Sequence, residues 1–160
     1  MAVNPDEFRN ALSRFASGVT VVTTRDNTGR FHGITVSAFS SVSLDPPLVL
    51  ICVEKATASH QAFHESGVFV VNVLSSEQRE VSEHFASPLE NKFEASEHSV
   101  GSLELPVLAG CLATLECRIK NVFDGGDHSI ILATVENSAV EDGDPLVYFR
   151  GTYGTTTADA

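Results

Sequence analysis

Runs of apolar and β-branched residues, separated by short polar turns, mark most of this chain as β-strand. Residues 113–120 alternate apolar and polar side chains, which is the pattern of a strand with one buried face. Residues 48–53 are apolar throughout, as expected for a strand that is buried on both faces. The predicted strands cover residues 18–24, 31–36, 48–53, 68–74, 113–120, 129–140 and 146–153.

Helical signals are fewer and shorter. The predicted helices cover residues 6–16, 59–66 and 75–85. In the first, large apolar residues recur on one face, and Gly67 follows the second in the usual position just past a helix end. Ser75 and Gln78 have the spacing of a capping box at the start of the third. Residues 88–101 are polar and are predicted to form a loop.

The order of these elements predicts a mostly β protein, a barrel with a few peripheral helices. Strands and helices do not alternate as a doubly wound sheet requires. A chain of 160 residues can bury a core without disulfides, and no repeat or linker divides it. We therefore expect a single domain over residues 1–160.

The amino-acid composition limits the cellular compartment and the classes of binding partner that we expect. No apolar run approaches the roughly 18 residues of a membrane span, and the N-terminus lacks the pattern of a signal peptide. Three cysteines without a C-x-x-C motif agree with a reducing compartment, so we expect a cytoplasmic protein without membrane contact. The net charge of −11 would repel a phosphate backbone, which argues against nucleic acid as a partner.

Hydroxyl side chains are unusually dense between Gly33 and Pro47. Four serines and a threonine stand among apolar residues there, and an Asp-Pro-Pro stop follows. Short hydroxyl side chains and a glycine let a ligand approach the backbone closely. This segment is predicted to form the wall of a site for a phosphate and a flat ring.

A phosphate cradle is predicted where the buried strand 48–53 leads into the next helix. Lys55 supplies an ammonium, Thr57 and Ser59 supply hydroxyls, and the helix start supplies N–H groups. The alternative is an ordinary helix cap by Ser59 alone. Further along, residues 85–86 and 92–93 could cover a ring, although packing explains them slightly better.

The turn Gly125-Gly126-Asp127-His128 is the second informative feature. Its glycines and aspartate suit a hairpin turn, but a turn does not explain the histidine. A histidine where a strand restarts can point into a barrel mouth, where a neutral imidazole can hydrogen-bond or stack near a ring.

Other chemistries find little support. The chain has no G-x-G-x-x-G loop, no Walker A motif and no G-x-S-x-G elbow. His60 and His64 have the spacing of a zinc pair, yet position 61 is glutamine, so we expect a solvated helix face and no metal site. Cys52 lies in an apolar strand without an adjacent cation, which argues against an activated thiolate.

Taken in order, several motifs resemble those of the short-chain flavin reductases, the reductase components of two-component flavin monooxygenases. The resemblance extends from about Phe8 to Gly154. It rests on residues 18–23, 33–47, 52–55, 66–67, 71–74, 126–128 and 148–154. It implies an FMN-binding split β-barrel, usually a homodimer, that passes a hydride from NADH or NADPH to FMN or FAD. The reduced flavin would then leave for a partner monooxygenase.

The resemblance also implies which residues contact the ligands. The flavin ring and ribityl chain would lie against Thr35, Val36, Ser37, Ala38 and Ser41. The ribityl chain and phosphate would follow Cys52, Val53, Glu54, Lys55 and Ser59. Phe85 and Ala86 would border the flavin, while His128 and Tyr153 would line the nicotinamide side. His128 is the candidate catalytic residue, acting by positioning, since hydride transfer needs no general base.

Two other functions remain open at this point. The same barrel could be a non-catalytic flavin-binding module, for which His128 and its turn would be unnecessary. It could also keep its flavin bound and reduce a small substrate directly. The few arginines favour NADH weakly over NADPH, because a 2′-phosphate calls for a nearby arginine.

Overall fold

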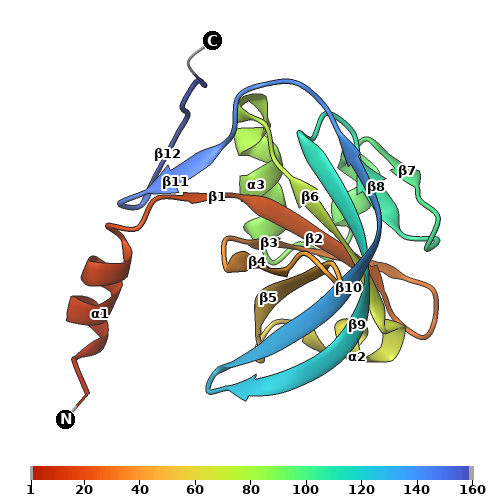
Figure 1. Ribbon diagram of the computed structural model, residues 1–160, viewed down its shortest axis with the longest axis horizontal. Coiled ribbons are helices and arrows are strands. Elements are labelled where there is room, and N and C mark those ends of the chain that lie inside the picture. The colour runs from red at the N-terminus through yellow and green to blue at the C-terminus, as the bar shows by residue number, and fades with distance from the viewer. Residues whose placement is uncertain (1, 159–160) are drawn as a thin grey trace.

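The computed structural model describes residues 2–158 and is mostly β. Its main sheet is antiparallel, with the strand order β3-β2-β6-β9-β10-β5-β4 (Figure 1). The strands of this sheet are β2 (Thr20–Arg25), β3 (Phe31–Val36), β4 (Phe39–Ser43), β5 (Leu48–Glu54), β6 (Val68–Val73), β9 (Ala113–Gly125) and β10 (His128–Val140). Six of the seven predicted strands are therefore confirmed in this sheet, while β4 was not predicted as a strand.

The barrel predicted from the sequence is split. Edge strands β3 and β4 are consecutive in the chain but are not paired with each other, so the sheet does not close by hydrogen bonds. Only Ser37 and Ala38 separate the two strands. The hydroxyl-rich segment thus lies at the split, where backbone groups are accessible to a ligand.

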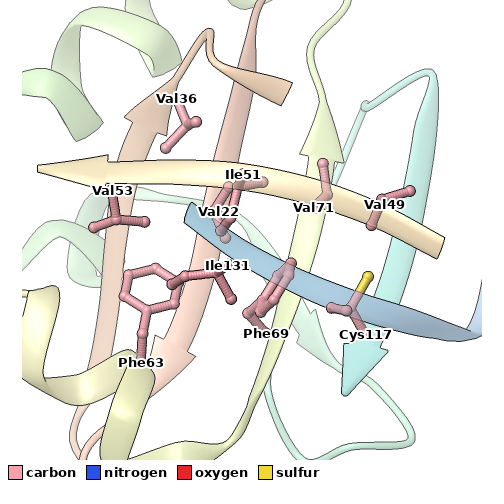
Figure 2. Packing of buried hydrophobic residues seen from close by; sticks show 11 residues of the cluster. Val22, Val36, Val49, Ile51, Val53, Phe63, Phe69, Val71, Cys117 and Ile131 are labelled. Atoms are coloured by element: carbon pink, nitrogen blue, oxygen red, sulfur yellow. The ribbon is translucent and has the colours of Figure 1, made fainter. Parts of the chain in front are cut away.

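A core of aromatic and branched aliphatic side chains fills the inside of this curved sheet. Phe63 and Phe69 meet edge to face with ring centroids 6.2 Å apart, and Ile131 and Ile51 pack in the same cluster (Figure 2). Phe63 comes from α2 (His60–Ser66), which ends at Gly67 with the predicted left-handed conformation, φ 68°.

The other elements are short. They are α1 (Pro5–Leu12), β1 (Ser17–Gly18), the 3₁₀ turn η1 (Ser76–Gln78), α3 (Arg79–Ala86), η2 (Lys92–Ala95), β7 (His98–Val100), β8 (Pro106–Leu108), β11 (Val147–Phe149) and β12 (Thr152–Gly154). The predicted capping contact exists, since Gln78 Oε1 accepts a hydrogen bond from Ser75 N at 2.9 Å. None of the helices between residues 2 and 158 has the length and apolar character needed to span a membrane.

Two predictions about these elements were wrong. The last strand, expected over 146–153, is the hairpin β11–β12, because Arg150 and Gly151 both adopt positive φ and reverse the chain. The loop expected at 88–101 contains η2 and β7, which pairs with β8. Strands of three residues are too short to show a period.

Helix α1 is shorter than predicted and lies apart from the main sheet (Figure 1). Asn4 Oδ1 caps it by accepting hydrogen bonds from the backbone N–H groups of Asp6 and Glu7. Its apolar face has no partner among residues 2–158, since Phe8 and Leu12 are more than half exposed. This exposed face is available to another molecule.

Candidate functional site

A cavity of about 750 Å³ opens at the split of the barrel. It is bordered by β3, the β3–β4 connection, the end of β5, the start of α2, the end of α3 and the chain up to Phe93. Its size lies within the usual range for small-molecule and cofactor sites. This is the place at which the sequence predicted a ligand.

The structure brings most of the predicted site residues into this one cavity. Those that line it are Thr35, Val36, Ser37, Ala38, Cys52, Val53, Glu54, Ser59, Phe85, Ala86 and His128. Ser41, Lys55 and Tyr153 do not line it.

Hydrogen bonds fix the hydroxyl-rich wall to its neighbours. Thr35 Oγ1 donates to the backbone oxygen of Ser82 at 2.6 Å, which ties β3 to α3. The backbone N–H of Cys52 donates to Ala38 O at 3.0 Å and so ties the β3–β4 connection to β5. The wall is therefore held by α3 at Thr35 and by β5 at Ala38, and this preorganises it for a ligand.

Close packing of α3 on β3 depends on a glycine. A Cβ atom added at Gly33 would lie 2.6 Å from Cε1 of Phe85. Phe85 is fully buried, and its ring meets Phe93 edge to face at 5.2 Å. The side chain of Phe85 therefore packs beneath this part of the wall as an aromatic floor. This agrees with the expectation that Phe85 serves in packing.

The predicted phosphate cradle is present in part. Ser59 is buried, lines the cavity, and its hydroxyl has no hydrogen-bond partner within the described residues. Thr57 also lines the cavity, but its hydroxyl donates to Glu54 O at 2.9 Å. A hydroxyl that has no protein partner and lies at a cavity is suited to a ligand oxygen.

Lys55 is directed toward the turn between β9 and β10. Its ammonium pairs with the carboxylate of Asp124 and donates to Gly126 O at 2.7 Å. The backbone N–H of Lys55 also donates to Asp127 O at 2.9 Å. Lys55 therefore stabilises the turn that carries His128, and it influences the cavity through that turn without lining it.

His128 lies where β10 begins, opposite Glu54 of β5, and it is partly exposed at the cavity. Its Nδ1 is 2.7 Å from Asp127 Oδ1, and this hydrogen bond is the main cause that lowers the pKa of Asp127. An ionised carboxylate can only accept, so Nδ1 carries the proton. In the neutral ring, Nε2 is then an acceptor that a ligand amide could use.

Tyr153 and Ser41 lie outside the wall. The hydroxyl of Tyr153 is 2.8 Å from Ser82 Oγ, and the Arg79 guanidinium lies 5.4 Å from the Tyr153 ring centroid. Tyr153 thus contacts Ser82 of α3, the residue whose backbone oxygen accepts the hydrogen bond from Thr35. Ser41 is exposed on edge strand β4.

Residues that the sequence did not assign also border the cavity. Arg30, Leu89 and Glu90 are the main additions, and Lys92 and Phe93 had been considered only as a cover or as packing. Lys92 Nζ donates to Gly33 O at 3.1 Å and to Phe85 O at 2.8 Å. The contact with Gly33 joins segments that are 59 residues apart, so no local sequence pattern predicts it.

The structure describes the histidine pair and the cysteine that were weighed as metal ligands and as a reactive thiol. Nε2 of His60 and Nε2 of His64 lie 3.4 Å apart on α2. No group of three or more potential metal-ligating side chains occurs in the part of the chain that the structure describes. Burial raises the pKa of the Cys52 thiol, which favours the unreactive protonated form.

Fold and cavity together define a mostly β protein with a cavity of cofactor size at the split of its barrel. The flavin reductase like domain matches residues 12–157, and the chain belongs to this family. The resemblance inferred from the sequence motifs is thereby confirmed.

Relatives and solved structures agree with this membership. The chain is 42% identical to "FMN reductase (NADH) SmoA" of Agrobacterium fabrum, over 94% of this chain and 86% of that one. It is 40% identical to a "Probable flavin reductase" of Rhizobium meliloti over 95% of this chain, but it spans only 49% of that relative. The structure of the NADH:FAD oxidoreductase SgcE6 from Streptomyces globisporus, in complex with NAD and FAD fragments, superposes with a TM-score of 0.92 at 34% identity, covering 100% of this chain and 99% of that one.

Proposed function

We propose that this chain is an NADH-dependent flavin reductase, which transfers a hydride from the nicotinamide to FMN or FAD. The observation that carries the proposal is the cavity at the split. It combines a hydroxyl-rich wall, the hydroxyl of Ser59 without a partner in the described residues, and an imidazole at its mouth. Relatives called an FMN reductase (NADH) and an NADH:FAD oxidoreductase support the same reaction.

The protein's contribution in this reaction is to bind and orient two rings. The flavin supplies the hydride-accepting chemistry when it is bound. Thr35, Ser37 and Ala38 would hold the ring edge with hydroxyl and backbone groups, and Ser59 would contact the phosphate. Neutral His128 would accept a hydrogen bond from the nicotinamide amide through Nε2. Phe85 and Phe93 exclude water from one side, which favours transfer of the hydride over side reactions.

Reduced flavin would be delivered to a second enzyme. Relatives include the reductase subunit HsaB of a flavin-dependent monooxygenase in Rhodococcus jostii, with 39% identity over 95% of this chain and 78% of that one. We therefore propose a flavin-dependent monooxygenase as the functional partner. The use of NADH makes the cytoplasm the expected location.

A homodimer is part of the proposal. Phe8 and Leu12 present an apolar face on α1 that the described part of the chain leaves uncovered, and a second copy would bury it. A solution mass of two chains that falls to one chain on Leu12→Glu would support this assignment. A wild-type protein that is monomeric at all concentrations would contradict it.

The first test is NADH oxidation by protein from which flavin has been removed. Oxidation that depends on added FMN or FAD and saturates with it is expected for a reductase that uses flavin as substrate. Flavin binding without oxidation of NADH or NADPH would instead indicate a binding module. Flavin that copurifies and resists removal would favour direct reduction of another substrate.

A further inference from the structure

We infer that Lys92 stabilises the negative charge that the flavin ring acquires on reduction. This inference rests on the proposed function and assigns a residue that favours the product of the hydride transfer. Two observations carry it: Lys92 lies in the cavity wall, and it has no carboxylate partner among the residues that the structure describes.

The cations near the cavity differ in their partners. Arg30 lines the cavity, but its guanidinium lies 3.7 Å from the carboxylate of Glu90. Lys55 pairs with Asp124 and does not line the cavity. Lys92 lines the cavity, and none of the ion pairs found within residues 2–158 includes it.

Arg14, Lys120 and Arg150 also form no ion pair within residues 2–158, but none of these three lines the cavity. The protein carries 21 acidic residues and only 10 lysines and arginines, so carboxylates outnumber cations twofold. The ammonium of Lys92 is held instead by two neutral carbonyl groups, Gly33 O at 3.1 Å and Phe85 O at 2.8 Å. An ammonium has three N–H donors, so one remains for a ligand.

The two carbonyl contacts also fix the charge in place. Gly33 belongs to β3 and Phe85 to α3, the two elements that carry the hydroxyl wall and its aromatic floor. Partial burial lowers the pKa of Lys92, which shows that its charge is incompletely solvated. A fixed, partly desolvated cation interacts more strongly with a nearby anion than a solvated one does.

Reduction places an anion in this cavity. Hydride transfer breaks a C–H bond of the dihydronicotinamide and forms an N–H bond on the flavin ring. The hydride brings two electrons and one proton, so the nicotinamide becomes a cation and the ring gains a negative charge. A protein cation near the ring tunes this equilibrium.

The test compares the affinity for oxidised and reduced flavin, measured anaerobically with dithionite-reduced ligand. FMN and riboflavin are both used, because riboflavin has the ring but lacks the phosphate. In Lys92→Met, the ratio of the two dissociation constants, oxidised over reduced, should fall by about tenfold for both ligands. A tenfold change corresponds to a shift of about 30 mV in the two-electron potential of the bound flavin.

Lys120→Met serves as the matched control, because it removes the same charge from the exposed part of β9 and should leave the ratio unchanged. Lys92→Gln keeps a donor for one carbonyl and gives the same test if the methionine variant fails to fold. An unchanged ratio overturns the inference. A loss of affinity that is confined to FMN and equal in both redox states also overturns it, because Lys92 would then contact the phosphate. Wild-type protein that binds no flavin would contradict the proposed function itself.

Discussion

The ion pair between Lys55 and Asp124 ties the end of β5 to the hairpin that presents His128. Lys55 follows β5 directly, and Asp124 lies near the end of β9. The ammonium also donates to Gly126 O within the turn. The sequence predicted Lys55 as a phosphate ligand, whereas in the structure its ammonium supports the turn that carries His128.

Removing either member of this pair should therefore have similar effects. We expect Lys55→Met and Asp124→Asn each to raise the KM for NADH by about threefold, with little change in flavin affinity. Steady-state kinetics and flavin titration measure the two effects separately. If Lys55→Met alone weakens FMN binding and spares riboflavin, Lys55 contacts the phosphate as the sequence predicted.

His128 is expected to act on the nicotinamide more than on the flavin. In His128→Ala the acceptor Nε2 is lost, and a lost hydrogen bond of about 1 kcal/mol corresponds to roughly a fivefold increase in the KM for NADH. The dissociation constant for flavin should change by less than about twofold. His128→Gln, which can still accept a hydrogen bond, should recover part of the loss, and an unchanged KM in His128→Ala would refute the assignment.

Gly33 is expected to be intolerant of a side chain. In Gly33→Ala the added Cβ would lie 2.6 Å from the ring of Phe85, which is fully buried and cannot move freely. Overpacking of this kind destabilises a core by about 1–3 kcal/mol. Urea unfolding should show this loss, accompanied by weaker flavin binding, because the wall and the floor would separate.

Gly18→Ala provides the control for this prediction. Gly18 is also in a strand, but no atom outside its chain neighbours lies within 4 Å of an added Cβ. This variant should retain both its unfolding free energy and its flavin affinity. Equal stability of the two variants would show that Phe85 adapts to the extra methyl group.

The sequence predicted the parts of this site that local pattern encodes. The high density of hydroxyl side chains identified Ser37 and its neighbours as site residues. His128 was identified by its position directly after a glycine-rich turn. Both belong to segments whose backbone conformation follows from nearby residues, namely a strand end and a hairpin turn. They converge because β10, which begins at His128, pairs with β5, and β5 is hydrogen-bonded to Ala38 in the β3–β4 connection.

Contacts that depend on distant segments could not be predicted in this way. Lys92 lies in a segment that seemed to be a polar loop, and its carbonyl partners are on β3 and α3. Lys55 was assigned to a phosphate because its neighbours suit one, but its partner Asp124 is 69 residues away. A lysine side chain is long enough to reach several different partners, and the tertiary structure determines which of them it contacts.

Glu116 should make the stability of the fold depend on pH in the acidic range. This residue of β9 is 6% exposed. Burial alone would raise its pKa, but hydrogen bonds donated by Leu103 N at 2.8 Å, Ser102 Oγ at 2.8 Å and Asn137 Nδ2 at 3.1 Å outweigh burial and lower the pKa. A pKa that is lower in the folded state stabilises the protein above the unfolded value, which is about 4.3 for glutamate.

The measurement is the free energy of unfolding of wild type and Glu116→Gln as a function of pH. The advantage of the wild type should be complete at neutral pH and should shrink as the pH falls below about 4.3 toward the folded-state pKa, because protonation removes the acceptor charge in both states. Glu141→Gln, at an exposed position, controls for the general loss of one negative charge. A difference between wild type and Glu116→Gln that stays constant throughout this range would mean that the carboxylate stabilises the fold by shape and packing, and that its charge contributes nothing.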